Sequence, residues 1–240
     1  MSGSDFALWV YLSRTPLLWL TVTIFAYVLA DRFSAKLNRN PLANPVLISV
    51  CLIGLILSMT NTPYRTYFEG AQFVHFMLGP ATVALAIPLY GHRRTVMRAI
   101  VPMAGALIIG AIVAMVAAVS IAKALGVPTQ VLISLAPKSV TGAVAMGVAE
   151  RAGGDASLAA VLVIITGVIG SIIVTPLMNS VGVRDMRARG FAVGVAAHGI
   201  GTARAFQVDM MAGTFAGIGM GLNAMLTPIL VPILLPWLLG

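Results

Sequence analysis

Charged side chains are scarce in this sequence, and their scarcity decides its class. Of its 240 residues 9% are charged and 59% are hydrophobic, and the mean hydropathy is +0.99. A soluble domain carries roughly a quarter charged residues, so this chain has too few to cover a surface in water. A membrane span takes about 20 apolar residues, which leaves room for roughly seven or eight hydrophobic segments. A soluble globular protein is therefore excluded.

Cysteine and a positively charged N-terminus are also lacking. Cys51 is the only cysteine, which excludes an intrachain disulfide and a cysteine-based metal site. It lies in an apolar run, where a small buried side chain is the expected role. We expect no cofactor and no metal. Residues 1–5 carry no positive side chain, so no cleaved signal peptide is expected and the first hydrophobic segment should stay and insert.

No enzyme signature is recognisable either. The sequence has no HExxH, P-loop or GxSxG motif and no paired carboxylates at catalytic spacing. A Ser–Lys dyad of Lys138 and Ser139 fails on geometry, since adjacent helical residues do not face each other. An intramembrane protease using Ser139 and His198 is the remaining alternative, and nothing further in the sequence argues for it. We therefore expect a protein that is not an enzyme.

Positive charge is the one kind of charge in excess, with a formal net charge of +8. Its residues form short clusters between apolar segments, at 31–39, 91–98 and 184–189. Such clusters are typical of cytoplasmic loops, whereas binding along a phosphate backbone needs a continuous basic face. We therefore expect a lipid bilayer as partner and no nucleic acid.

The hydrophobic pattern predicts an all-α integral membrane protein, a single transmembrane domain over residues 1–240. The predicted segments are 17–30, 45–59, 70–90, 95–125, 129–149, 156–178, 190–208 and 210–239. If every segment crossed the bilayer, cluster 184–189 would lie on the side opposite to the other two clusters. That conflict disappears if the segment around Pro137 enters and returns on one side, so we predict a re-entrant or broken segment there.

A short motif occurs twice. Residues 78–83 and 135–140 share the pattern L-x-P-x-[ST]-V, which is either coincidence or the trace of an internal repeat. A repeat would make Thr82 the counterpart of Ser139 and would divide the chain into related halves, at about 15–125 and 126–240. Many transporters with inverted repeats carry such paired, interrupted segments around a midplane site. We predict at least two broken or re-entrant segments in a fold of this kind.

The first group of candidate site residues surrounds Pro137. Proline removes a backbone donor and disfavours helix at the preceding residue, so the helix should restart with Lys138 or Ser139 near its N-terminus. Free N–H groups, the helix dipole and the ammonium would together attract an anion, and Thr141 lies in the same stretch. The alternative is a loop lysine that reaches the membrane interface. An isolated charge inside a span is usually functional.

The second group follows at His198, Gly199, Gly201, Thr202 and Arg204. The glycines loosen the helix, and Thr202 is predicted to cap a second half-helix. Arg204 could hold a carboxylate through two parallel N–H bonds, and His198 could donate a hydrogen bond or carry a proton. The alternatives are a packing face of small residues and an arginine at the membrane edge.

Three polar residues are weaker candidates. Thr82 enters only through the possible repeat, and Asn61 lies in a loop. Asn223 lies in the middle of the last segment and needs a partner there, although a single buried asparagine is more often a bond between helices than a ligand contact. We include Thr82 and Asn223 among the predicted substrate-binding residues.

At these two groups the sequence resembles the LrgB/CidB family of bacterial membrane proteins. Residues 136–141 match its PKSVT stretch, and residues 189–194 and 197–205 match its RG-x-x-x-G and H-x-x-GTARA stretches. The likeness extends from about residue 40 to the end of the chain. The sequence departs from the family pattern at Gly142 and Ala143, where a threonine and a proline are common.

The resemblance implies a multi-pass protein of the bacterial cytoplasmic membrane, acting with a small LrgA/CidA-like membrane protein and forming a homo-oligomer. It also implies two rival functions. One is a holin/antiholin-like modulator of murein hydrolase activity and autolysis. The other is transport of short monocarboxylates such as pyruvate, glycolate or lactate, since plastid relatives move glycolate and glycerate. Because a cation at a broken helix suits an anion site, we expect a transporter of small organic anions. In this interpretation the carboxylate lies between two sets of residues: Lys138, Ser139 and Thr141 on one side, and His198, Thr202 and Arg204 on the other.

Overall fold

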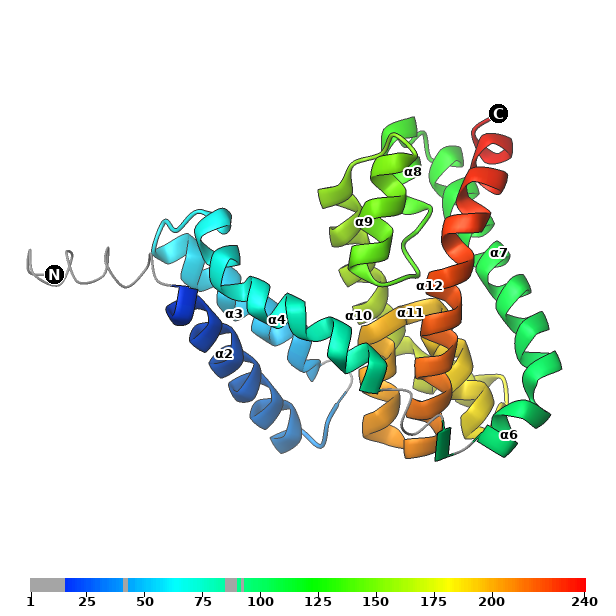
Figure 1. Cartoon of the computed structure of the whole chain (residues 1–240), viewed down its shortest axis with the longest axis horizontal. Helices are drawn as coiled ribbons and strands as arrows, with labels where there is room; N and C mark the ends of the chain where they lie inside the picture. Colours follow the sequence, from blue (N-terminus) through cyan, green and yellow to red (C-terminus); the bar gives the residue numbers. More distant parts are fainter. Residues whose placement is uncertain (1–15, 41–42, 85–89, 92) are drawn as a thin grey trace, which may run out of the picture. The chain divides into compact units, whose positions relative to one another are not determined.

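The computed structural model of the chain describes residues 16–40, 43–84, 90–91 and 93–240 (Figure 1). Every regular element in these residues is a helix, as predicted for an all-α membrane protein. Four helices are long and apolar enough to cross a membrane, namely α2 (Pro16–Lys36), α7 (Ile100–Ala124), α10 (Ala156–Ser180) and α12 (Met210–Leu239). The chain forms two compact units, Met1–Ala86 and Ile87–Gly240. The predicted halves, 15–125 and 126–240, were proposed from a repeated sequence motif and not from packing. The two compact units therefore do not test them, and the halves stay a prediction.

The first unit consists of α2, α3 (Pro45–Met59) and α4 (Tyr64–Ala84), with α2 packed against both others. Trp19 is fully buried in it, and its ring meets that of Tyr67 edge to face, with centroids 5.8 Å apart. A methyl group on Gly70 would lie 2.7 Å from the Trp19 Cβ, so glycine is needed for this close packing. Asn44 begins α3 by accepting hydrogen bonds from two backbone N–H groups.

The second unit is built around α7, α10 and α12. The Lys123 ammonium, near the end of α7, donates to the carbonyls of Leu238 and Leu239 at 2.8 and 2.9 Å. The two helices therefore end together and run parallel. The N-terminal parts of the two helices also lie together, since Leu107 of α7 packs with Phe215 of α12 in one hydrophobic cluster. Helix α10 runs the other way, because it begins beside the C-terminal part of α12 and ends beside the start of α11 (Met186–Val208).

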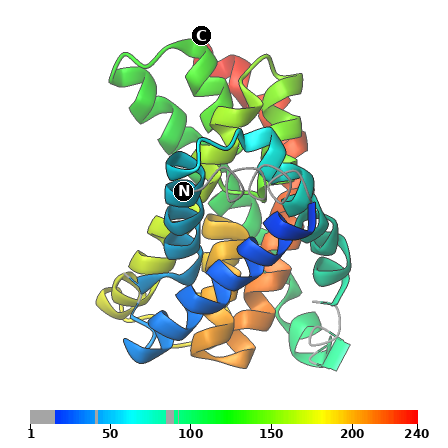
Figure 2. The same ribbon diagram turned by 90° about the vertical axis from the view of Figure 1, so that its left-hand side faces the viewer.

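Two shorter elements complete this unit. Helices α8 (Thr129–Leu135) and α9 (Gly142–Arg151) lie beside the C-terminal, red part of α12 in both views, and α11 lies beside its orange N-terminal part (Figures 1 and 2). Core contacts agree, since Leu132 packs with Leu235 whereas Ala205 packs with Ala212. The two segments that carry the predicted interruptions thus lie along opposite halves of α12.

Two of the basic clusters lie at one end of the second unit. Arg98, the last residue of α6 (Arg93–Arg98), and Arg187 line the same groove. We call the end that holds residues 93–98 and 184–189 the arginine end. Here the Arg187 guanidinium donates to Asp185 at 2.6 Å, and this bond holds the pKa of the Asp185 carboxyl below its usual range. The positive-inside rule requires these two basic clusters to lie on the same side of the membrane. Their position at one end of the second unit agrees with a re-entrant segment around Pro137.

The two copies of the L-x-P-x-[ST]-V motif have different local structures. Pro80 lies inside the continuous helix α4, whereas Pro137 lies in the turn between α8 and α9. Thr82 lies on α4, in the first unit, and its side chain is outside the described residues. Thr82 as a substrate-binding residue therefore stays a prediction. Helix α12 is continuous through Pro228, Pro232 and Pro236.

Candidate functional site

The segment around Pro137 is a helical hairpin, which confirms the predicted break. Helix α8 ends at Leu135, residues 136–141 form a turn, and α9 begins at Gly142. After α9 the chain returns to α8, because the Asp155 N–H donates to the Ser134 hydroxyl at 2.8 Å. We call residues 129–151 the first hairpin. It enters and leaves at the end opposite to the arginine end.

The helix restarts later than predicted. Thr141 is the extended residue before α9, so Lys138 and Ser139 lie in the turn and not in the first turn of the new helix. The Lys138 N–H donates to the Leu135 carbonyl at 3.1 Å, which closes the turn over Pro137. The chain thus carries the lysine and the serine at the tip of the hairpin, just before the N-terminus of α9.

Helix α11 is a second hairpin. Its backbone leaves helical geometry at Ala197 and His198, where the φ angle of His198 is +40°. Residues 193 and 201 would be about 12 Å apart along a straight helix, yet a methyl group on Gly201 would lie 3.1 Å from the Val193 carbonyl oxygen. The two arms, 186–196 and 199–208, therefore lie side by side. We call this the second hairpin, and its open end is at the arginine end.

The tips of both hairpins meet at one side chain in the middle of α12. The Asn223 amide donates to the Val195 carbonyl at 2.9 Å and to the Ser139 carbonyl at 3.3 Å. Its oxygen accepts from the Thr227 hydroxyl at 3.2 Å, which fixes the orientation of the amide. The side chain is 1% exposed, so each of these bonds replaces contact with solvent or lipid. Asn223 thus bridges two segments that lie far apart in the sequence.

Three polar side chains gather around this junction. His198 is buried, and its Nε2 lies 2.9 Å from the Val163 carbonyl of α10. Since a carbonyl can only accept, Nε2 carries the proton in this bond. Ser139 is buried, and its hydroxyl lies 3.4 Å from the Lys138 ammonium at the tip of the first hairpin. The structure therefore brings together Lys138, Ser139, His198 and Asn223, all predicted site residues.

The remaining predicted residues have other positions. Thr202 does not cap the outgoing arm, because it lies within it and donates to the His198 carbonyl at 2.7 Å. Arg204 lies further along that arm, beside Arg189 in a small cavity, and donates to Gln207 at 3.4 Å. The described contacts therefore do not put Arg204 opposite Lys138, since the hairpin carries it back toward the arginine end.

The glycines of the second hairpin divide in role. Gly201 is needed where the arms touch, whereas a methyl group on Gly199 would have no neighbour nearer than 3.8 Å. On α10, Gly167 makes room for the imidazole, since a methyl group there would lie 2.7 Å from the His198 Cε1. Sequence reasoning missed Gly167 and the Val163 carbonyl, because nothing in an apolar helix indicates which face meets the histidine.

Comparison with known proteins gives the same family as the motifs. Residues 23–237 match the model of the LrgB-like family. The holin-like protein CidB of Staphylococcus epidermidis is 31% identical over 203 residues, which cover 85% of this chain and 88% of the relative. The holin-like protein CidB of Staphylococcus aureus is 31% identical over 85% of this chain and 89% of the relative. The uncharacterized protein YwbG of Bacillus subtilis is 34% identical over 84% of this chain and 89% of the relative. No solved structure matches the chain. This chain is a membrane protein that belongs to the LrgB family.

Proposed function

We propose that this protein is a membrane carrier for small organic anions, short monocarboxylates such as pyruvate, glycolate or lactate, and not an enzyme. The observation that carries the proposal is the meeting of two helical hairpins at Asn223, with a lysine at one tip. Interrupted helices that meet in the middle of a bundle are typical of secondary transporters, where irregular backbone lines a substrate site.

The chemistry of the tips suits a carboxylate. The Lys138 ammonium supplies a positive charge, and α9 begins four residues later at Gly142, where no side chain caps its first N–H groups. Both favour an anion. The Ser139 hydroxyl lies 3.4 Å from the ammonium, and His198, at the tip of the second hairpin, would complete the site. A nonspecific hole would need none of these groups, and an isolated ammonium inside a membrane is costly unless it is used.

The two hairpins also suggest how access would alternate. The first opens toward one end of α12 and the second toward the other, and each tip is bound to the same amide. Movement of one hairpin would break one hydrogen bond of Asn223 and leave the other in place. This arrangement supports a carrier in which each hairpin closes the site from its own side.

The test is uptake of labelled pyruvate, glycolate or lactate by proteoliposomes that contain the purified protein. We expect Lys138→Gln to lower uptake by about tenfold or more, the loss typical of a hydrogen bond to a charged group. Arg151→Gln, at the exposed end of α9, changes the charge of the same hairpin and should leave uptake intact. Equal leakage of an uncharged dye of similar size would contradict the proposal and indicate a pore.

A second function is favoured by the relatives named holin-like protein CidB. In that case the chain modulates murein hydrolase activity and autolysis, as a homo-oligomer with a small LrgA/CidA-like partner in the bacterial cytoplasmic membrane. It predicts that Lys138→Gln leaves the rate of autolysis of the host unchanged, whereas loss of the partner alters it. A carrier whose substrate controls lysis predicts that Lys138→Gln alters both uptake and autolysis.

A further inference from the structure

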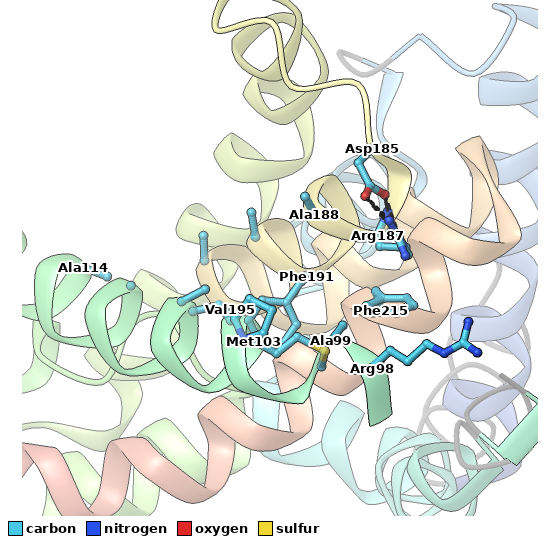
Figure 3. Close-up of a pocket in the computed structure, with 15 residues that line it drawn as sticks. Arg98, Ala99, Met103, Ala114, Asp185, Arg187, Ala188, Phe191, Val195 and Phe215 are labelled. Carbon is cyan, nitrogen blue, oxygen red and sulfur yellow. Dashed lines mark hydrogen bonds and ion pairs between the residues drawn. The ribbon is translucent and has the colours of Figure 1, made fainter. Parts of the chain in front are cut away.

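A groove runs along the second unit between α7 and the incoming arm of the second hairpin. It encloses about 590 Å³, within the size range of ligand sites. Many of its lining residues are small, listed here from the arginine end: Ala99 just before α7, Ala106, Gly110 and Ala114 on α7, and Ala188 and Ala192 on α11. Figure 3 shows Met103, Phe191 and Val195 close together between the two helices. The groove is therefore a long apolar slot.

The length of the groove matches one leaflet of a bilayer. Arg98, at its mouth, precedes the membrane-crossing part of α7, and Ala114 is the deepest lining residue on that helix. The helical rise puts Ile100, the first residue of α7, about 21 Å from Ala114. Half of a bilayer, with its headgroup region, measures about 20–22 Å. The groove thus extends from the headgroup level to about the middle of the membrane.

Charge is confined to the mouth. Arg98 and Arg187 line the groove at the arginine end and are exposed. The two basic clusters there hold six arginines and one aspartate, Asp185. Beyond the mouth every lining residue is Ala, Gly, Pro, Val, Met or Phe. An occupant must therefore carry negative charge at one end and a long apolar part at the other.

This pattern separates a lipid from a small carboxylate. A passage for carboxylates would need polar groups along its length, because a charge without partners in an apolar slot is costly. An acyl chain needs none, and its phosphate would stay at the interface beside the guanidinium groups. We propose that this groove binds an anionic phospholipid, with its phosphate at Arg98 and Arg187 and one acyl chain between α7 and α11.

Native mass spectrometry of the full-length protein in detergent tests the site. Phosphatidylglycerol and phosphatidylcholine with identical acyl chains are added in turn. We expect phosphatidylglycerol to be retained more tightly, and Arg98→Gln or Arg187→Gln to weaken its binding by about fivefold each. Ala106→Leu with Ala192→Leu fills the groove and should abolish the preference. Ala143→Leu with Arg151→Gln, in the groove between α9 and α12 at the opposite end, should leave it intact.

Further measurements separate a lipid from other occupants. The melting temperature without added lipid shows whether the double variant with Ala106→Leu and Ala192→Leu still folds. If the double variant does not fold, the single variant Ala106→Leu is used in its place. Equal retention of both lipids by the wild type would overturn the proposal, as would unchanged retention by a folded, filled variant. Displacement of the lipid by glycerol 3-phosphate would point to a site for free phosphates and overturn it too. If the wild type is a dimer and the filled variant is a monomer, the groove binds a second copy of this protein, which would also overturn the proposal. None of these outcomes depends on transport.

Discussion

Asn223 is the residue on which both hairpin tips depend. Its amide uses both N–H donors on backbone carbonyls and its oxygen on Thr227, so every polar group of the side chain is paired. Membrane interiors offer no water to replace such bonds. The sequence alone placed Asn223 among the weaker candidates, because a lone polar residue in an apolar helix does not disclose its partner. His198 was a stronger candidate, and its partner also turned out to be a backbone carbonyl.

Replacing Asn223 should therefore loosen the junction. We expect Asn223→Leu to lower the free energy of unfolding by about 1–2 kcal/mol, since bonds between membrane helices are individually modest. Asn223→Asp should cost more, because a carboxylate would face two carbonyls with no hydrogen to donate. Thr227→Val, which removes one bond only, is the matched control. Unfolding in detergent monitored by circular dichroism gives the values, and wild-type stability of Asn223→Leu would contradict the bridge.

His198 has a backbone conformation that favours glycine. Its φ of +40° is uncommon for a residue with a Cβ. Both His198→Gly and His198→Ala remove the imidazole and its bond to Val163. We expect the glycine variant to be more stable than the alanine variant by about 1 kcal/mol, because only alanine retains the steric cost of a positive φ. A straight helix would reverse the order, since alanine is the better helix former. Unfolding curves of the two variants, measured under the same conditions, give the sign of the difference in their free energies of unfolding.

At the scale of elements, each hairpin depends on residues that let two arms or two helices touch. In the second hairpin the arms meet at Gly201, and its incoming arm meets α12 at Gly190 and Gly194, where a methyl group would collide with the carbonyls of Ala212 and Ala216. The sequence predicted the interruptions from Pro137 and the paired glycines. It could not predict that α11 folds back on itself, because its dihedral break falls on a histidine and its pattern remains apolar.

Two glycines of the second hairpin allow a matched comparison. Gly201→Ala puts a methyl group 2.7 Å from the Ala197 Cβ, so we expect a loss of about 1–3 kcal/mol of stability from overpacking. Gly199→Ala has open space around it and should be neutral or stabilising by up to about 1 kcal/mol. Thermal unfolding of both variants in detergent measures the difference. Equal effects at the two positions would mean that the arms do not touch.

For the whole molecule, the hairpins decide how the chain is threaded through the bilayer. Among the described residues of the second unit, the helices that are both long and apolar enough to cross a membrane are α7, α10 and α12. Because both hairpins return to the end from which they enter, residues 93–98 and 184–189 share one side and residues 151–155 lie on the other. From the positive-inside pattern we then expect the arginine end to face the cytoplasm.

Cysteine labelling in cells tests this threading, and the single native cysteine makes it simple. In a Cys51→Ala background, Arg98→Cys and Arg187→Cys should react only with a reagent that crosses the membrane. Gly153→Cys, in the loop after the first hairpin, should react with an impermeant maleimide added outside. As a control, cysteines accessible from outside are first blocked with the impermeant maleimide, before the reagent that crosses the membrane is added. Labelling of positions 98 and 153 from the same side would contradict a re-entrant first hairpin.

Membrane residence, the helical class, the family and the two interrupted segments could be predicted from the sequence alone, because each depends on composition or on contiguous motifs. The tertiary structure decided how those interruptions are used. It showed that both are hairpins entered from opposite ends, that their tips share Asn223, and that Arg204 is carried away from Lys138. These contacts join residues that are distant along the chain, such as Ser139 and Asn223. In a chain that is apolar on every face, hydrophobic periodicity cannot say which faces meet, so only packing could decide it.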